Sequence, residues 1–473
     1  MSPIDVPVLA GPAPGPLIER ADGQAAIRAY HELRRRVFVE QEGLFDRTDL
    51  DEADDDPRTV VLVARDPADG AVVGGVRLGP VPFPAARGIG GGTDIGWWRG
   101  GRLAVSRATR GAPGAGPALI RAACAYAESA GVLRFEAAVR ARHAPAFARL
   151  GWRRVRPARP DEAPSGREPH VLMRHPIGRI AALVAAAKKP LGPLLAGFAP
   201  GGPGFVGDDG APVPGTDVVA ACDAILPSMV ERDPEWAGWC SVLVNLNDLA
   251  AMGAEPVGLL DALGARDARA AARVLDGLGR AAAAYGVPVL GGHTQLGVPA
   301  ALSVTALGRT ARPVPGGGGR PGHRVRLTAD LGGGWRPGYT GRQWDSTTVR
   351  RTPELRAMLG AVAAARPHAA KDVSMAGVAG TLGMMAEAAG CGAVLDVAAV
   401  PRPAGAAMGD WLTCFPGFAM LTAAPAGAGP LPAGPATGAE CGELVPGRGV
   451  SLRWPDGELT EVITDGVTGL GRA

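Results

Sequence analysis

Hydrophobic and polar positions recur with two different periods along this chain. Towards the N-terminus, valine-rich runs such as TVVLVARD and AVVGGVRL are short and apolar, which predicts buried strands. Around them, AAIRAYHELRRRVF and PALIRAACAYAESAG place apolar residues three and four positions apart, which predicts amphipathic helices. Strands therefore accompany helices, and we expect an α/β domain over residues 17–177.

The rest of the chain shows the same two patterns in two further blocks. Residues 204–314 contain strand-like runs around two helical stretches, and residues 322–473 mix strands and helices with proline-rich loops. Proline and glycine break regular structure in the linker that we expect at 178–203, and again in the run RPVPGGGGRPGHR. We therefore predict an α+β multidomain protein: an N-terminal domain followed by a module of two subdomains.

One helical stretch carries polar residues beside its apolar stripe. In NLNDLAAMGAEP, Leu246, Ala250 and Gly253 continue an apolar stripe at spacings of three and four. Asn245 and Asp248 are three residues apart, so their side chains stand on one face of the same helix. Gly253 marks the expected end of the helix. This helix buries its stripe and presents an amide and a carboxylate to another part of the protein.

Composition and charge exclude several classes of protein. The 473 residues hold 49 Lys and Arg against 46 Asp and Glu, so no strong field would attract nucleic acid or an anionic membrane. The six cysteines form no CxxC pair, and we expect reduced thiols in place of disulfides or a zinc site. The sequence shows neither a secretory pattern nor a bilayer-spanning run. We expect a cytoplasmic protein with no nucleic-acid or membrane partner.

The stretch GGRLAVSRATRGAPGAGPALIRAACAYAESAG is a candidate phosphate-binding element. A strand at 102–105 leads into a loop rich in Arg and Gly, and the loop opens a helix near Pro117. The free backbone amides of a helix N-terminus suit a pyrophosphate. An ordinary tight turn is the alternative interpretation of the same residues.

The surrounding motifs favour the phosphate site. LRRRVFVEQEGLFDRTDLDEAD, VVGGVRL, GGRLAV and APAFARLGW follow one another in an order that resembles the GCN5-related N-acetyltransferases (GNAT), of the type linked with nitrogen starvation. The resemblance implies a GNAT α/β fold and acetyl-CoA as cofactor. The acetyl-CoA-binding positions that it implies are Leu103, Ala104, Val105, Arg110, Gly111, Gly114, Ala115 and Gly116. The loop departs from the family pattern, because Arg110 lies one residue further from Gly114, with Pro113 between them.

A general base for the amine substrate is harder to choose. Glu136, on the predicted strand RFEAAV, is the candidate, because a carboxylate near the parted strands could accept the proton through water. An ordinary carboxylate at a strand edge is the alternative. The acidic run DLDEADDDP is either a solvated loop or an attractor for a cationic amine.

Carboxylates in the second half of the chain lie beside glycines or at the ends of predicted elements. Asp208 and Asp209 stand in VGDDGA, Asp223 in ACDAILP and Asp372 in KDVSMAGVAGTLGMMAEAAG, and Asp248 lies on the helix already described. Mg²⁺ prefers oxygen ligands and bridges phosphate oxygens in triphosphate sites. Each aspartate taken singly is also a common turn or cap residue. The set as a whole suggests a site for Mg²⁺ and a nucleotide triphosphate.

These motifs, with GGHT and WLTCFPGFAMLTAAP, resemble the AIR synthase-related (PurM-like) superfamily of ATP-dependent enzymes. The resemblance implies a homodimer that binds ATP and Mg²⁺ and transfers phosphate to an oxygen nucleophile. The metal ligands that it implies are Asp208, Asp209, Asp223 and Asp248. Asn245, Gly291, Gly292 and Asp372 would contact or order the nucleotide, and Asp248 and His293 would be catalytic. A structural histidine at a strand end is the alternative for His293.

Departures from the superfamily narrow the reaction. Met375 replaces the second aspartate of the kinase motif, and the cysteines used by selenophosphate synthetases and by the hydrogenase maturation protein are missing. We therefore expect one of two functions: a bifunctional enzyme of nitrogen metabolism that acetylates a small-molecule amine and phosphorylates an oxygen, or a sensor that binds acetyl-CoA and nucleotide without turnover.

Overall fold

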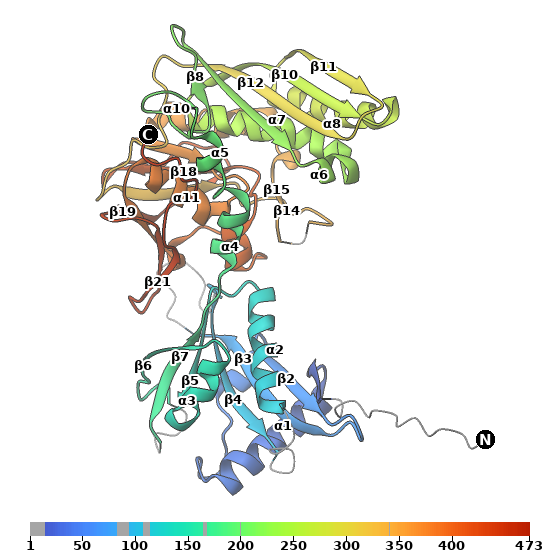
Figure 1. The fold of residues 1–473 in the computed structure, drawn as a ribbon, viewed down its shortest axis with the longest axis vertical. Helices are drawn as coiled ribbons and strands as arrows, with labels where there is room; N and C mark the ends of the chain where they lie inside the picture. Colours follow the sequence, from blue (N-terminus) through green and yellow to red (C-terminus); the bar gives the residue numbers. More distant parts are fainter. Residues whose placement is uncertain (1–14, 83–93, 107–113, 164–167, 199, 340) are drawn as a thin grey trace, which may run out of the picture. The chain divides into compact units, whose positions relative to one another are not determined.

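The computed structural model describes the chain apart from residues 1–14, 83–93, 107–113, 164–167, 199 and 340 (Figure 1). The chain divides into two compact units, Met1–Ile177 and Gly178–Ala473. Among the helices that the structure describes, none combines the length and the apolar character needed to cross a membrane.

Unit 1 is built on a seven-stranded sheet with the strand order β1-β2-β3-β4-β5-β7-β6. Its strands are β1 (Leu17–Arg20), β2 (Val60–Arg65), β3 (Val72–Pro80), β4 (Trp97–Val105), β5 (Arg134–Arg140), β6 (Arg153–Pro157) and β7 (His170–His175). Its helices are α1 (Gln24–Arg34), α2 (Ala115–Ser129) and α3 (Ala144–Arg149), with the helical turns η1 (Arg35–Gln41), η2 (Glu52–Asp54) and η4 (Ala141–His143). Strands β4 and β5 pair in parallel from Trp97↔Arg134 to Gly100↔Ala137, and this pairing stops there although both strands continue.

The two faces of this sheet are covered by different helices. Side chains on β2 alternate in direction, so Val61 and Val63 pack with α1, while Leu62 and Ala64 pack with α2. All four side chains are buried. A strand covered on both faces needs apolar residues at successive positions, which explains the unbroken run TVVLVARD.

The acidic run is in part a solvated loop, as one interpretation predicted, because Glu52 and Asp55 are exposed. Other carboxylates of the run form an internal ion-pair network that the sequence did not predict. Arg34 is fully buried and donates to Asp49 Oδ2 at 2.7 Å and to Asp54 Oδ1 at 2.6 Å. Arg102 donates to Asp51 Oδ2 at 2.7 Å. Burial alone would raise the pKa of Asp54, but the hydrogen bond from Arg34 and the charge of Arg77 hold it below its ordinary value. Because arginines engage these carboxylates, the run joins α1 to the sheet.

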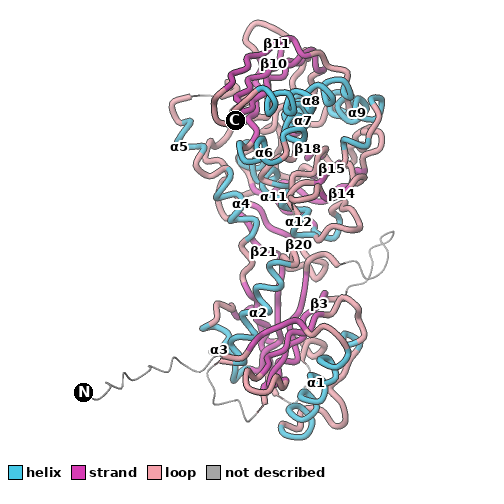
Figure 2. Tube along the Cα trace, turned by 90° about the vertical axis from the view of Figure 1, so that its right-hand side faces the viewer, coloured by secondary structure: helices cyan, strands magenta, loops and turns pink. Residues whose placement is uncertain are grey.

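The N-terminal subdomain of unit 2 contains a five-stranded sheet with the order β11-β10-β12-β9-β8. Its strands are β8 (Ala211–Pro212), β9 (Val218–Ile225), β10 (Glu255–Ala265), β11 (Val289–Leu296) and β12 (Ala301–Arg309), and its helices are α6 (Pro227–Arg232), α7 (Pro234–Ala251) and α8 (Ala268–Tyr285). Helices α7 and α8 pack together on one face of the sheet (Figures 1 and 2). The other face carries exposed apolar side chains, with Leu260 40% and Leu290 57% exposed.

Helix α7 confirms the predicted helix and shows why its motif is unusual. The chain leaves it through Gly253, whose φ of +64° is a left-handed conformation that glycine adopts without strain. Asn245 and Asp248 are buried on it together with Leu246 and Ala250. The polar face of the helix therefore points into the protein.

The C-terminal subdomain contains a seven-stranded sheet with the order β16-β18-β13-β19-β17-β20-β21. Its strands are β13 (Arg324–Ala329), β16 (Ala369–Asp372), β17 (Gly392–Asp396), β18 (Ala419–Ala424), β19 (Thr437–Val445), β20 (Val450–Arg453) and β21 (Leu459–Ile463), and β14 (Gly334–Trp335) pairs with β15 (Trp344–Asp345) in a separate hairpin. Its helices are α9 (Thr352–Leu359), α10 (Ala361–Ala365), α11 (Gly377–Ala388) and α12 (Met408–Thr413), with the turns η5 (Thr347–Val349) and η6 (Val397–Ala399).

The segment 178–203, expected to be a linker, contains two helices that belong to unit 2. Helix α4 (Arg179–Ala187) packs against α11, α12 and β21, and it buries Ile180 and Val184. Helix α5 (Leu191–Leu195) follows it, and the Gly192 amide donates to the Thr468 carbonyl at 2.7 Å. Apolar residues on one side of the alanine-rich run therefore hold most of this segment on the second unit.

Candidate functional sites in the two units

A cavity of about 720 Å³ lies in unit 1 where β4 and β5 part. Beyond Gly100 and Ala137 these two strands no longer share a hydrogen-bond ladder with each other, while β4 still pairs with β3. Backbone groups on the facing edges can then pair with an extended ligand. Residues from both strands line the cavity, among them Gly101, Leu103, Val105, Ala138 and Val139.

Part of the predicted acetyl-CoA site lies on this cavity. Leu103, Val105 and Gly116 line it. Ala104 is buried on the opposite side of β4, against the helical segment that contains Leu33, and its side chain therefore cannot touch a ligand in the cavity. Ala115 is buried in the core beneath α2. Strand alternation thus selects Leu103 and Val105 as the ligand-facing side chains of β4.

The N-terminus of α2 has the features of an anion-binding site. Gly114 caps the helix with φ +110°, a conformation that other residues rarely adopt. Within the described residues, no side chain caps the first amides of α2, so they can donate to an anion. Gly116 has open space around its Cα, with Val105 the nearest neighbour of an added Cβ at 3.9 Å. Arg110 and Gly111 lie outside the described residues.

Glu136 is wrong as a general base. Its side chain is completely buried, although its neighbours Phe135 and Ala137 on β5 line the cavity. Its Oε1 accepts from Arg134 and Arg174, each Nε at 2.8 Å, and its Oε2 accepts from the Trp97 indole at 2.9 Å. A carboxylate held this way has no oxygen facing a substrate, so Glu136 has a structural role.

Among the described residues, three other side chains that can accept a proton line the cavity: Glu42, His143 and His170. Glu42 Oε2 lies 2.8 Å from Arg140 Nη2, and His170 Nδ1 lies 2.8 Å from the Glu168 carbonyl oxygen. His143 ends the turn that follows β5 directly. None of these three residues was predicted from the sequence. The signal for His143 was its position between the strand RFEAAVR and the helical run APAFAR.

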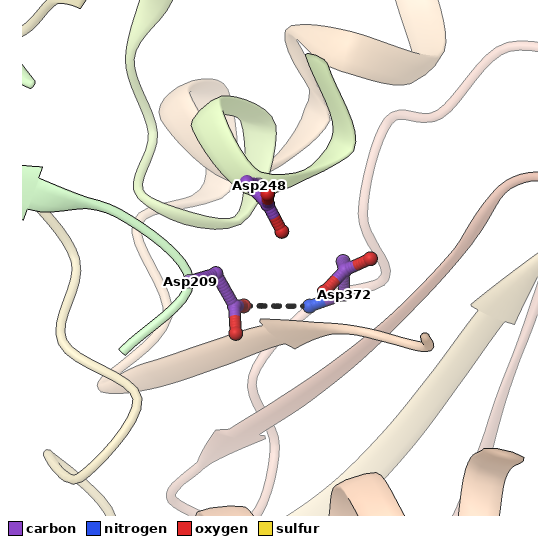
Figure 3. A group of neighbouring side chains, drawn as sticks. All are labelled: Asp209, Asp248 and Asp372. Atoms are coloured by element: carbon purple, nitrogen blue, oxygen red, sulfur yellow. Dashed lines mark hydrogen bonds between the residues drawn. The ribbon is translucent and has the colours of Figure 1, made fainter. Parts of the chain in front are cut away.

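In unit 2, three predicted carboxylates meet. Oxygen atoms of Asp209, Asp248 and Asp372 all lie within 4.8 Å of one another, and each residue comes from a different element (Figure 3). Asp209 lies in the loop before β8, Asp248 on α7 and Asp372 at the end of β16. The Asp372 amide donates to Asp209 Oδ2 at 2.9 Å. Both subdomains of unit 2 therefore contribute to one acidic group.

Burial and mutual repulsion make this group costly to ionise. Burial, followed by the charges of Asp372 and Asp223, raises the pKa of Asp248 well above its ordinary value. Burial and the Asp209 charge do the same to the pKa of Asp372. Lys371 is buried beside them, with Nζ 2.7 Å from Asp209 Oδ1. Burial lowers the pKa of Lys371, but the charges of Asp209 and its neighbour in the same loop outweigh it and raise the pKa overall.

The donor set fits a hard divalent cation. Three carboxylates within one small volume are the ligands that Mg²⁺ prefers. Asp372 Oδ2 is buried and has no hydrogen-bond partner among the described residues, as expected for an atom that a cation would contact. A cation bound here would satisfy this oxygen, which the described residues leave unpaired.

The other predicted carboxylates lie outside this group of three. Asp208 Oδ2 accepts from the Gly316 amide at 2.9 Å, and burial raises the pKa of Asp208 to about 6. Asp223 lies on β9, where partial desolvation raises its pKa and the Lys188 charge opposes the rise. Asn245 accepts from the Asp223 amide at 3.0 Å through Oδ1, and its Nδ2 donates to a carbonyl within α7. Asn245 therefore orders the position of Asp223 through the backbone.

Gly291, Gly292 and His293 were expected beside the nucleotide, but in one chain they are separate from the acidic group. They lie on β11, the edge strand of the N-terminal subdomain sheet, and all three are exposed. His293 pairs in register with Ala262 of β10. Gly292 packs over Asp261, whose Oδ1 would clash with an added Cβ.

Three family models match this chain, one in unit 1 and two in unit 2. The acetyltransferase (GNAT) family matches residues 26–152. The N-terminal and C-terminal domains of AIR synthase related protein match residues 207–310 and 320–451. An uncharacterized protein of Synechocystis sp. is 37% identical over 224 residues, which cover 46% of this chain and 69% of that protein. The chain is a fusion of a GNAT domain with an AIR synthase related protein.

Other relatives match the AIR synthase related half of the fusion less completely. An uncharacterized protein of Methanocaldococcus jannaschii is 31% identical over 199 residues, 40% of this chain and 60% of the relative. A thiamine-monophosphate kinase of Synechococcus elongatus is 36% identical over 126 residues, 24% of this chain and 38% of the kinase. The fusion thus spans well under two thirds of that kinase.

Two solved structures are also similar to the fusion. T. maritima PurL complexed with ATP has a TM-score of 0.46 at 18% identity, over 56% of this chain and 46% of that one. Thiamine monophosphate kinase from Aquifex aeolicus has a TM-score of 0.42 at 19% identity, over 54% of this chain and 93% of that one.

Proposed function

We propose that the fusion is a bifunctional enzyme: an acetyl-CoA-dependent N-acetyltransferase joined to an ATP- and Mg²⁺-dependent phosphoryl-transfer module. The observation that carries the proposal is that each unit builds a site suited to its cofactor. Unit 1 parts β4 from β5 over a cavity beside uncapped helix amides, and unit 2 gathers Asp209, Asp248 and Asp372. We further propose that both activities serve cytoplasmic nitrogen metabolism.

In unit 1 the residues would bind and orient acetyl-CoA. The first amides of α2 would hold its pyrophosphate, and the free edge of β4 near Leu103 and Val105 would pair with its pantetheine arm. When bound, acetyl-CoA supplies a thioester that an amine can attack. The cavity would place the acetyl group between the parted strands, where the amine acceptor can approach it.

The first prediction is that acetyl-CoA raises the melting temperature of the full chain. A ligand that binds the native state alone adds roughly 2.7 kcal/mol of stability at a hundredfold excess over its dissociation constant. Gly116→Leu should abolish the shift, because its side chain would extend into the cavity over the amides of α2. A melting curve that millimolar acetyl-CoA leaves unmoved would remove the acetyltransferase proposal.

Gly279→Leu is the matched control for this experiment. Gly279 also lies in an α-helix with open space around it, but on α8 of the other unit. The control should keep the full acetyl-CoA shift, so that loss in Gly116→Leu alone reports on the cavity.

In unit 2 the acidic group would hold the metal against the nucleotide phosphates. Mg²⁺ would neutralise charge on the transferring phosphate. Asp248 and Asp372 would orient the cation from the two subdomains, and Lys371 would keep Asp209 in place through their 2.7 Å ion pair. An oxygen nucleophile of a small molecule would be the acceptor.

The second prediction is a homodimer formed through the uncovered face of the β8–β12 sheet. Exposed Leu260 and Leu290 leave this face apolar, and a second copy of the chain would bury it. Light scattering should give twice the chain mass of 48.0 kDa. Leu260→Asp should shift the mass towards one chain. Leu459→Asp, at a leucine of the other subdomain that is 52% exposed, should stay dimeric.

A monomeric mass for the unaltered chain at micromolar concentration would contradict the homodimer. Equal masses for the Leu260→Asp and Leu459→Asp variants would place the interface elsewhere.

A further inference from the structure

The proposed acetyltransferase cavity contains an imidazole, that of His143, which has only a long hydrogen bond among the described residues. His143 ends η4 and precedes α3, and it lines the cavity together with Phe147 one helical turn later. The turn η4 follows β5 directly, beyond the point where β5 stops pairing with β4. The ring therefore stands where the sheet opens to admit a ligand.

The charged groups around His143 come from three directions. Arg140 of β5 and Arg142 of η4 precede it in the chain, Glu42 follows η1, and Glu168 precedes β7. Burial, then Arg140 and Arg142, lower the pKa of His143, and the two glutamates only partly oppose this. Imidazole is thus the dominant form near neutral pH, and one ring nitrogen offers a lone pair.

Glu42 and His170, which also line the cavity, are less suited to proton transfer. Glu42 is engaged in an ion pair, with Oε2 2.8 Å from Arg140 Nη2. His170 is tied through Nδ1 to the Glu168 carbonyl at 2.8 Å. Within the described part of the chain, the His143 ring accepts one long hydrogen bond, from Arg142 Nε to Nε2 at 3.4 Å. His143 can therefore reorient towards a substrate at little cost.

We propose that His143 is the residue that carries the proton during acetyl transfer. This rests on the proposed N-acetyltransferase function of unit 1. The amine nitrogen attacks the thioester carbonyl carbon, a C–N bond forms and the C–S bond breaks. The proton lost by the nitrogen passes to the His143 ring and from there to the departing CoA sulfur. The products are an amide and CoA thiol, and the imidazole returns to its neutral form.

The test is the pH dependence of CoA release from acetyl-CoA by the full chain, with methylamine as the acceptor probe. The rate of CoA release should rise with pH, and this rising limb should have its midpoint below the ordinary pKa of histidine. His143→Gln keeps a polar side chain that cannot titrate, so it should remove this limb and lower kcat/KM at pH 7 by about a hundredfold or more. Acetyl-CoA should still shift the melting temperature of the variant.

His31→Gln is the matched control. Burial followed by the Arg34 charge also lowers the pKa of His31, but this residue lies on α1 beside Asp54 and outside the cavity lining. Its variant should retain the pH limb of the unaltered chain. Loss of the limb in both variants would assign it to the fold in general and overturn the role of His143.

A second readout needs no turnover. Diethylpyrocarbonate modifies neutral imidazole, and peptide mass spectrometry reports the rate at each histidine. Acetyl-CoA should slow the modification of His143 at least severalfold and leave His31 unaffected. Identical CoA-release profiles for the unaltered chain and His143→Gln, or modification of His143 at the same rate with and without acetyl-CoA, would overturn the proposal. Failure of acetyl-CoA to shift the melting temperature would instead overturn the acetyltransferase function itself.

Discussion

Asp248→Asn should lower Mg²⁺-dependent ADP release by orders of magnitude while the protein melts at the same or a higher temperature. The substitution keeps the size of the side chain but removes the charge that would hold the cation from α7. Loss of a group that acts mainly in the transition state lowers turnover and leaves the fold in place. ADP release and the melting temperature of the variant measure the two effects separately.

The direction of the stability change follows from the pKa of Asp248. Burial and three neighbouring carboxylates raise the pKa of Asp248 in the folded protein. The folded protein is therefore most stable at low pH, where Asp248 is protonated, and it loses stability as the pH rises above the pKa that Asp248 has in the unfolded chain. At neutral pH a neutral asparagine removes that cost. A structural cap would behave in the opposite way and cost about 1 to 3 kcal/mol when replaced.

Asp217→Asn provides the control for Asp248→Asn. Asp217 is an exposed aspartate of the same subdomain, paired with Arg309 at 2.6 Å, and its replacement should change neither ADP release nor melting temperature. A destabilised Asp248→Asn variant with full turnover per folded molecule would exclude the catalytic role. ATP that stabilises the unaltered chain without ADP release would favour the sensor function.

The sequence alone predicts the three members of the acidic group, but it does not predict which of the candidate carboxylates meet. Asp209, Asp248 and Asp372 lie in three motifs whose order resembles a known superfamily, and the fold brings them together. The local sequence pattern shows that each aspartate lies at the end of a helix or strand or interrupts one. It does not show which of these helices and strands come together in the fold. Asp223 illustrates the difference, because it follows the same rule and yet lies outside the group of three.

The N-terminal unit shows a second limit of sequence patterns. The apolar runs correctly place strands such as β2, because burial on both faces requires apolar residues at every position. A charged residue carries no such signal about its partners. Asp49 and Asp54 were predicted to face solvent or substrate, but Arg34, an arginine distant in sequence, holds both inside the fold.

Glu136→Gln should destabilise unit 1 by about 3 to 5 kcal/mol, because breaking a buried ion pair leaves the partner charge uncompensated. Arg134 and Arg174 both donate to Glu136 Oε1, and the Glu136 and Arg134 side chains are completely buried. A neutral amide would leave these two guanidinium groups without the negative charge of Glu136. Urea unfolding of the full chain, followed by the fluorescence of tryptophans such as Trp97, measures the loss.

Glu19→Gln separates the effect of burial from that of pairing. Glu19 also pairs with an arginine of the sheet, Arg65 at 2.5 Å, but it is 40% exposed at the edge strand β1. Solvent screens such a pair, so its loss should cost less than about 1 kcal/mol. CoA release per folded molecule should be unchanged in both variants. If Glu136→Gln instead keeps full stability and loses CoA release, Glu136 acts in the chemistry and the cavity does not define the acetyl-transfer site.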